Sequence, residues 1–250
     1  MRVLIRLEAV KDCVYDLMYH RKLQGLLYGL LRDTPYSGLH DQEGYKFFCF
    51  SNIFPPRDVT EGNRRSLLVS SPDKELVKVF EGKFRDFQDK NVNLNIGEWS
   101  FQVDSVKTFD LSIGKSCKLV TGTPIVIRIS ENRFEQYHIH PDKDYEYVYW
   151  KKRYPLGVFI RQLEENLFKK YIQFHGSTEE SFTVFQELKY RKQVCNHVPI
   201  HGREVKMIGT LWEFQFHNLN KKQRKILKFG IDAGFGELNS LGFGFMNPLR

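Results

Sequence analysis

The order in which two hydrophobic periods follow one another most limits how this chain can fold. Apolar side chains alternate over residues 3–7, as in a strand, and then recur over residues 23–31 at the spacing of a helix with one buried face. The same two periods predict strands over 47–54 and 65–70, a helix over 76–87, and a strand over 99–103 after a turn at Gly97. This order, β-α-β-β-α-β, is that of the ferredoxin-like unit.

The second half of the chain repeats the order of elements without repeating the sequence. Its predicted elements are a strand over 125–129, a helix over 156–172, strands over 182–195 and 203–216, a helix over 220–233 and a strand over 242–247. The sequence therefore predicts an α+β fold made of two tandem ferredoxin-like (RRM-like) domains. We place these domains at residues 1–118 and 119–250, with the boundary near 117–121.

Composition and charge limit the classes of function. A hydrophobic content of 41% is enough for packed cores, and the net charge of +8 favours a polyanionic partner, although lysines that serve solubility would give the same balance. The four cysteines form no C-x-x-C pair, which indicates buried, reduced thiols in a cytoplasmic protein and neither a zinc site nor a disulfide framework. No apolar run approaches the ~18 residues of a membrane span.

A glycine-rich stretch follows the last predicted helix. Two Gly-x-Gly pairs, at residues 234–236 and 242–244, bracket five residues. Glycine tolerates positive φ and has no Cβ, so its backbone can approach a phosphate chain closely. The dinucleotide fingerprint does not fit, because Asn239 stands where a third glycine is needed and the stretch follows a helix where the fingerprint opens one. The simpler alternative is a glycine-rich turn between a helix and a strand.

The helix before this stretch is strongly basic. Its cations are Lys221, Lys222, Arg224, Lys225 and Lys228. Five cations of this kind usually form a solvated helix face. Because they lie within one or two turns of the glycine-rich stretch, we interpret them as a surface that tracks phosphates. Residues 203–206 form another basic cluster.

Three side chains could carry acid–base chemistry. His40 lies in a polar loop, where a side chain is easily presented to a cleft, and Tyr28 lies on the first predicted helix but off its leucine stripe. Lys46 begins the next strand, and Tyr45 beside it is a possible substitute for Tyr28. A tyrosine, a histidine and a lysine supply proton transfer and a cation for phosphate charge without a metal. No histidine spacing predicts a metal site.

These features together resemble the CRISPR-associated repeat-processing endoribonucleases of the RAMP superfamily, in their archaeal form. The glycine-rich stretch is similar to the signature of that family. The order and spacing of residues 23–28, His40 and Lys46 resemble its catalytic tyrosine, histidine and lysine, and the opening residues 1–7 and the junction 123–125 are similar as well. The loop before His40 is shorter than in such relatives, so Lys46 is less firmly matched than His40.

The resemblance implies a reaction and a set of residues. The expected enzyme cuts precursor CRISPR RNA within its repeats, without metal or other cofactor, when the 2′-OH attacks the adjacent phosphorus and leaves a 2′,3′-cyclic phosphate and a 5′-OH. His40 and Tyr28 would exchange the protons, in an order that the sequence leaves open, and Lys46 would stabilise charge. The residues expected to bind RNA are Gly234, Gly236, Asn239, Ser240, Gly242, Gly244, Lys222, Lys225, Arg203 and Lys206.

Two other functions stay open at this point. The first is a non-catalytic subunit of the same superfamily that only holds CRISPR RNA inside an effector complex. The second is a general single-strand RNA-binding protein. Repeat RNA is the expected partner, effector-complex proteins and a second copy of the chain are possible further partners, and no membrane is expected.

Overall fold

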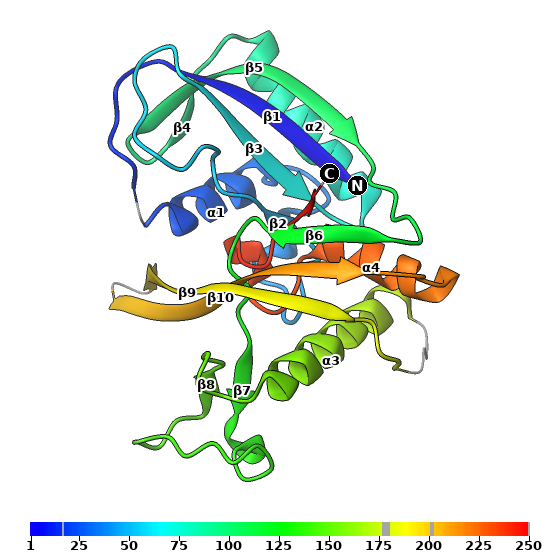
Figure 1. Cartoon of the computed structure of the whole chain (residues 1–250). Coiled ribbons are helices and arrows are strands. Elements are labelled where there is room, and N and C mark those ends of the chain that lie inside the picture. The colour runs from blue at the N-terminus through cyan, green and yellow to red at the C-terminus, as the bar shows by residue number, and fades with distance from the viewer. Residues whose placement is uncertain (17, 177–180, 201–202, 250) are drawn as a thin grey trace.

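The structure is a computed structural model that describes residues 1–16, 18–176, 181–200 and 203–249. Its first half forms one antiparallel sheet with the strand order β2-β3-β1-β5-β4 (Figure 1). The elements of this half are β1 (Arg2–Ala9), α1 (Tyr19–Leu30), a single 3-10 turn (Ser37–Leu39), β2 (Cys49–Phe50), β3 (Arg64–Ser70), α2 (Lys74–Asp89), β4 (Leu94–Ile96) and β5 (Trp99–Phe109). Without the short hairpin strand β4, this is the predicted β-α-β-β-α-β unit.

The second half builds the same arrangement in another sheet, with the order β11-β6-β10-β9. Its elements are β6 (Cys117–Thr121), β7 (Arg128–Ser130), a 3-10 turn (Glu131–Arg133), β8 (Tyr147–Tyr149), α3 (Leu156–His175), β9 (Glu187–Ile200), β10 (Arg203–Phe216), α4 (Lys221–Ala233), a 3-10 turn (Asn239–Leu241) and β11 (Met246–Leu249). In both sheets the first strand of the unit lies between the third and the fourth. The predicted α+β class and tandem ferredoxin-like order are confirmed.

Each half has its own hydrophobic core. Leu23 and Leu27 of α1 are fully buried against the first sheet, as their helical spacing predicts, together with Phe80 and Phe84 of α2. The larger core of the second half collects aromatic rings from β10 and from α3, with Trp212 stacked on Phe159 at 4.5 Å. The apolar faces of α1 and α2 therefore form one core with the first sheet, and the second half has a separate core of its own.

The start of the second half differs from the sequence-based expectation. Cys117–Thr121, which we expected at a domain boundary, is strand β6 and pairs with both β10 and β11. The strand expected over 125–129 is largely a connection: Ile125 and Val126 make single bridges to Thr210 and Glu237 before β7 begins. These residues are buried and apolar, and apolar periodicity reports burial whether or not a strand ladder follows. The division at 118/119 stays a prediction.

The two halves are joined by a buried arginine. Arg2 begins β1 in the first half but is only 1% exposed. Its guanidinium donates hydrogen bonds to the carbonyl oxygens of Ile231 and Met246, and it lies 4.5 Å from the ring centre of Phe245. A buried cation needs such partners. Figure 1 shows the C-terminus, in red, beside the N-terminus at the start of β1.

Two smaller expectations concern cysteines and membranes. All four cysteines are free, but only Cys49 is fully buried, and Cys195 is exposed, so the expectation of buried thiols holds for one of them. Among the described residues, no helix combines the length and apolar character needed to cross a bilayer.

Candidate active site

His40 and Tyr28 lie together in an open cleft. Tyr28 of α1 is partly buried and packs against the edge of the first core. The loop after α1 brings His40 next to it, with ring centres 4.8 Å apart and ring planes nearly perpendicular. The cleft has a volume of about 380 Å³. Its lining residues are Arg21, Gln24, Gly25, Tyr28, Gly29, Arg32, Ser37, His40 and Asp41. Two arginines beside a histidine and a tyrosine make this a polar, cationic cleft.

The two side chains differ in exposure and in their partners. The side chain of His40 is 58% exposed, and its Nδ1 lies 2.9 Å from a carboxylate oxygen of Asp41. Asp41 can therefore hold the ring orientation and leave Nε2 directed to other groups. Burial raises the pKa of the Tyr28 hydroxyl, and a hydrogen bond with the Ser240 side chain opposes this rise. Tyr28 is therefore protonated at neutral pH and is able to donate a proton.

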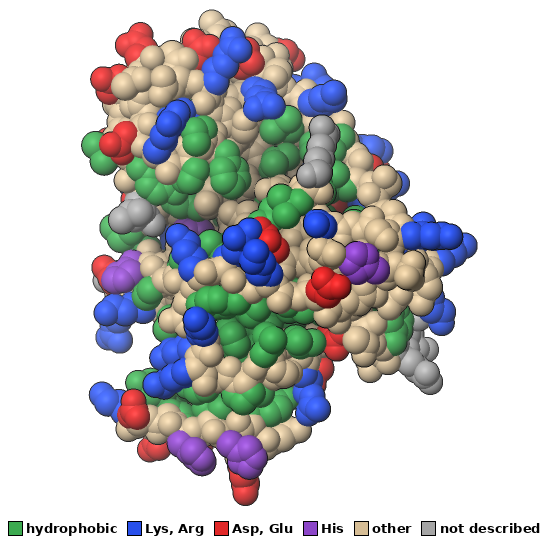
Figure 2. Space-filling view, viewed as in Figure 1, with side chains coloured by type: hydrophobic (Ala, Val, Ile, Leu, Met, Phe, Trp, Pro, Cys, Tyr) green, Lys and Arg blue, Asp and Glu red, His purple; other side chains and the backbone are tan. Residues whose placement is uncertain are grey.

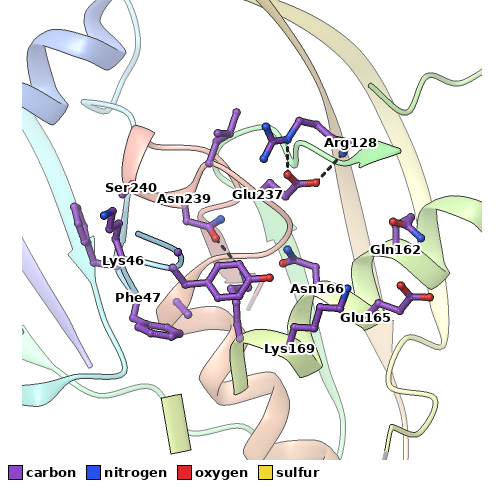
Figure 3. Close-up of a pocket in the computed structure, with 16 residues that line it drawn as sticks. Lys46, Phe47, Arg128, Gln162, Glu165, Asn166, Lys169, Glu237, Asn239 and Ser240 are labelled. Carbon is purple, nitrogen blue, oxygen red and sulfur yellow. Dashed lines mark hydrogen bonds and ion pairs between the residues drawn. The ribbon is translucent and has the colours of Figure 1, made fainter. Parts of the chain in front are cut away.

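Lys46 lies in a neighbouring pocket and does not line the His40 cleft. This second pocket has a volume of about 420 Å³ and is shown in Figure 3. Partial burial lowers the pKa of Lys46, while the nearby carboxylates of Asp41 and Glu43 raise it. Tyr45 also lines the second pocket, so the residue beside His40 is Tyr28 and not its possible substitute. The structure thus brings two of the three predicted catalytic residues together and places the third in the neighbouring pocket.

The glycine-rich stretch is closely packed inside the protein. Gly242 has φ of +88°, and a Cβ at this position would lie 2.4 Å from the ring of Phe50 in the first half. Gly244 has φ of +73°, and its Cβ would lie 1.9 Å from the carbonyl oxygen of Phe235. Both glycines are buried. The absence of a side chain is therefore required at Gly242 by packing against the first half and at Gly244 by packing within the second half. Contact of these glycines with RNA stays a prediction.

A buried lysine organises the turn between the two glycine pairs. Lys170 of α3 is 1% exposed, and its ammonium donates to the carbonyl oxygens of Gly234 and Gly236 and to Oδ1 of Asn239. The amide nitrogen of Asn239 in turn donates to the carbonyls of Phe235 and Phe243. Burial lowers the pKa of Lys170 to about 7. Sequence analysis missed Lys170, although a lysine on the buried stripe of a helix is a detectable signal.

Ser240 connects this turn to the His40 cleft. Its carbonyl oxygen accepts a hydrogen bond of 3.1 Å from Nε2 of Gln24, one helical turn before Tyr28. Its side chain bonds with the Tyr28 hydroxyl, and it also lines the second pocket. Of the residues expected to bind RNA, Ser240 is therefore the one that touches the candidate catalytic pair.

Most basic residues of α4 lie farther from the glycine-rich stretch than we expected. Lys222 and Lys225 are exposed near the start of α4, and Lys225 lies 5.4 Å from the ring centre of Tyr171. Gly234 lies twelve positions after Lys222, which is about 18 Å along a helix. The expected spacing of one or two turns applies only to Lys228, whose ammonium is held by Asp110 and Asp232. A role of Lys222 and Lys225 in RNA binding stays a prediction.

Arg203 and Lys206 lie on the long β9–β10 hairpin, and both are exposed. On the same hairpin Asn196 contacts the ring of His20 at the start of α1, with 3.2 Å between Nδ2 and Nε2, so the hairpin lies beside the first half. Figure 2 shows Lys and Arg side chains over the face that β9 and β10 form in Figure 1. Lys206 also lines a depression of about 570 Å³ that contains several tyrosines.

The described residues contain no group of three or more His, Cys, Asp or Glu side chains that could hold a metal ion. His138 and His140, the two histidines closest to each other in the sequence, are both exposed. The chemistry available in the cleft is thus that of a histidine, a protonated tyrosine and nearby cations. Such a set can move protons and stabilise negative charge at a phosphate.

Comparison with known proteins shows which protein family this chain is similar to. Residues 106–248 match the family model described as "CRISPR associated protein Cas6, C-terminal". A curated relative from Methanocaldococcus jannaschii, named "CRISPR-associated endoribonuclease Cas6 2", is 33% identical over 259 residues that cover 100% of each chain. The "CRISPR-associated endoribonuclease Cas6" of Haloferax mediterranei is 31% identical and is matched over 93% of its length by 99% of this chain.

Solved structures agree with the fold. A "CRISPR associated protein Cas6" superposes with a TM-score of 0.73 at 21% identity, over 100% of this chain and 99% of that one. A structure titled "An RAMP protein binding different RNA substrates" gives a TM-score of 0.75 at 18% identity and covers 100% of both chains. At this level of identity, the likeness supports the tandem fold, while the curated relatives carry the sequence relationship.

Proposed function

Because the chain belongs to the Cas6 family of CRISPR-associated proteins, we propose that it is an endoribonuclease that cleaves precursor CRISPR RNA within its repeats, by a mechanism that needs no metal ion. The observation that carries this proposal is the perpendicular pair of His40 and Tyr28 in an open cleft with arginines on its walls. The names of the curated relatives support the same substrate.

The proposed reaction is an intramolecular transesterification. The 2′-oxygen forms a bond to the adjacent phosphorus, and the bond from phosphorus to the 5′-oxygen breaks, so that a 2′,3′-cyclic phosphate and a 5′-hydroxyl result. We assign His40, through Nε2, as the base that takes the 2′-hydroxyl proton. Tyr28, whose hydroxyl is protonated at neutral pH, then gives its proton to the leaving 5′-oxygen.

Charge on the phosphorane would be stabilised by cations beside the pair. Arg21 and Arg32 line the His40 cleft, and Lys46 lies in the adjoining pocket. A cation that approaches the developing negative charge lowers the barrier more in a partly buried cleft than in open water. Arg203, Lys206, Lys222 and Lys225 would contribute binding along the rest of the RNA, with strong salt dependence.

The direct test uses the purified protein, repeat RNA and EDTA. We expect cleavage at one position in the repeat, at an undiminished rate in the chelator, with a 2′,3′-cyclic phosphate on the upstream product. An RNA with a 2′-deoxy nucleotide before the scissile phosphate should bind and stay intact, because it lacks the nucleophile. Cleavage of that RNA would exclude the transesterification.

The same experiment separates the alternative functions. A protein that binds the repeat tightly and never cuts it would be a non-catalytic RNA-binding subunit of the RAMP superfamily. A protein that binds unrelated single-stranded RNA equally well would be a general RNA-binding protein. We further propose that the cleaved RNA passes from this protein to effector-complex proteins. Whether the protein forms a homodimer is a separate question, which sedimentation of the free protein would answer.

A further inference from the structure

The pocket next to the His40 cleft is built by both halves of the protein. It has a volume of about 420 Å³, within the ~300–1,000 Å³ range of small-ligand sites. Three segments form its walls: residues 44–48 after the His40 loop, one face of α3, and residues 237–240 between the glycine pairs. Figure 3 shows Asn166, Gln162 and Lys169 on the α3 wall, with Glu237 and Arg128 opposite. Each of the three walls therefore carries polar or charged groups.

The α3 wall carries an unpartnered polar group. Gln162, Asn166 and Lys169 share one face of the helix because they are four and three residues apart. The side-chain oxygen of Asn166 is buried, and no described residue donates a hydrogen bond to it. Buried polar atoms in folded proteins nearly always have a partner. Because Asn166 lines the pocket, we interpret its orphaned oxygen as an acceptor that an N–H or O–H donor bound in the pocket would satisfy.

The other walls supply charge and an aromatic ring. Arg128 is fixed by an ion pair of 2.5 Å with Glu237, so its charge is already matched. Lys46 and Lys169 line the pocket without an ion pair among the described residues, and they are its available cations. Tyr45 is partly buried in the same wall, and burial raises the pKa of its hydroxyl. A flat ring, an amide and two cations are the groups that recognise one nucleotide.

The pocket adjoins the candidate catalytic pair through two residues. Ser240 lines the pocket and bonds with the Tyr28 hydroxyl. Phe48 also lines it, with its ring centre 5.6 Å from that of Tyr28. A nucleotide in the pocket would therefore be a near neighbour of the phosphate at His40.

We propose that this pocket binds a single unstacked nucleobase of the RNA, next to the cleaved position, and that Asn166 reads its Watson–Crick edge. The inference rests on the proposed function, because it takes the occupant from the RNA at the His40 cleft. An amide presents one donor and one acceptor side by side, which matches the edge of a base in a single strand. Lys46 and Lys169 then face the phosphates that flank this base.

The test measures binding, so that it does not depend on cleavage. Repeat RNAs with a 2′-deoxy nucleotide at the scissile position are prepared with one abasic nucleotide at each position in turn. For the wild-type protein, we expect an abasic nucleotide at one position near the cleavage site to weaken binding about tenfold, the usual effect of losing one stacked and hydrogen-bonded base. Abasic nucleotides farther away should have smaller effects.

The decisive measurement compares the RNA affinity of the variant Asn166→Leu with that of the wild type. The variant should bind unmodified RNA about tenfold more weakly, and the abasic nucleotide at the sensitive position should cause a smaller further loss than in the wild type, because the hydrogen bonds of the amide are already gone and only stacking remains to be lost. Asn166→Ala is the second variant, since it cannot overfill the pocket. Asn93→Leu, an exposed loop residue of the first half, is the control and should behave as the wild type does.

These measurements distinguish failure of the proposed function from failure of the proposed base-binding role of the pocket. If the wild-type protein binds no repeat RNA, the proposed function fails. If it binds and cuts repeat RNA, but the abasic effect has the same size in Asn166→Leu, Asn166→Ala and the wild type at every position, the pocket does not read a base and the inference is overturned.

Discussion

At the scale of single residues, the candidate active site depends on His40. His40→Ala should slow cleavage by about 10²–10⁴-fold, the usual contribution of one general acid–base group. Its side chain is exposed and contacts little besides Asp41 and Tyr28, so stability and RNA affinity should stay near wild type. Single-turnover cleavage and binding to the 2′-deoxy RNA measure the two effects separately.

The matched control for this variant is His140→Ala, since His140 is exposed and lies outside the cleft. It should cut at the wild-type rate. Should His40→Ala also cut at that rate while another histidine variant is inactive, the active site is elsewhere.

The roles of Tyr28 and His40 can be distinguished with a modified substrate. Replacing the leaving 5′-oxygen by sulfur removes the need for an acid, because a thiol with a pKa of about 8.5 leaves readily as its anion. We expect Tyr28→Phe to be slow on ordinary RNA and near wild type on the 5′-thio RNA, while His40→Ala stays slow on both. Rescue of His40→Ala and not of Tyr28→Phe would exchange the two roles.

At the residue scale, the type and sequence surroundings of a side chain were enough to predict that His40 and Tyr28 lie close together, while their catalytic roles stay predictions. A histidine in a polar loop and a tyrosine off its helix stripe could be selected in this way, and the structure places them together. Lys170 was detectable as a lysine among buried helix positions, but its three oxygen partners were not. The unpartnered amide of Asn166 could not be predicted, because burial of one atom depends on the packing of both halves.

At the scale of elements, the glycine-rich stretch should be sensitive to any side chain. Gly244→Ala would place a Cβ 1.9 Å from a backbone oxygen at positive φ, so the free energy of unfolding should fall by about 1–3 kcal/mol or more. Gly82→Ala in α2 is the control: nothing lies within 4 Å of its Cβ, and alanine in a helix interior should add about 0.5–1 kcal/mol. Urea unfolding measures both. Equal stability of Gly244→Ala and wild type would mean that the turn is not closely packed in solution.

The order of elements was largely predictable because helices and strands have distinct hydrophobic periods. The helix expected over 156–172 is α3, and the one expected over 220–233 is α4, which begins after the capping residue Asn220. β6 was missed because it has only five residues and Leu119 is its one buried apolar side chain, too few to show an alternating pattern. Residues 125–127 were assigned to a strand because they are apolar, while the structure uses them as a buried connection with single bridges.

At the scale of the whole molecule, the contact between the halves explains the burial of two polar residues, Arg2 and His20, which the strand and helix patterns did not predict. Arg2 and Arg6 share the outer face of β1, yet Arg6 is exposed and Arg2 is covered by the second half. The pattern of one domain cannot show which part of its surface a second domain will cover. The same reasoning applies to His20, which begins α1 and is 1% exposed.

His20 is held at the meeting point of three segments. Its Nδ1 lies 3.1 Å from the carbonyl oxygen of Leu241, to which it donates, and its Nε2 accepts from Asn196 of β9. Its ring stacks on Phe243 with a centroid distance of 4.9 Å. Both ring nitrogens are therefore satisfied in the neutral form, and burial lowers the pKa of His20 to about 4.

This lowered pKa predicts a loss of stability in acid. Between pH 6.5 and 4, the unfolded chain binds a proton at His20 that the folded protein does not, so the stability present above pH 6.5 is lost as the pH falls. From the pKa difference, His20 alone should lower the free energy of unfolding by about 2 kcal/mol at pH 5 compared with pH 8. Urea unfolding of the wild type and of His20→Gln at both pH values measures this share. The variant should be less stable at pH 8 and should lose about 2 kcal/mol less on acidification, whereas equal losses in the two proteins would show that His20 is not buried as a neutral ring.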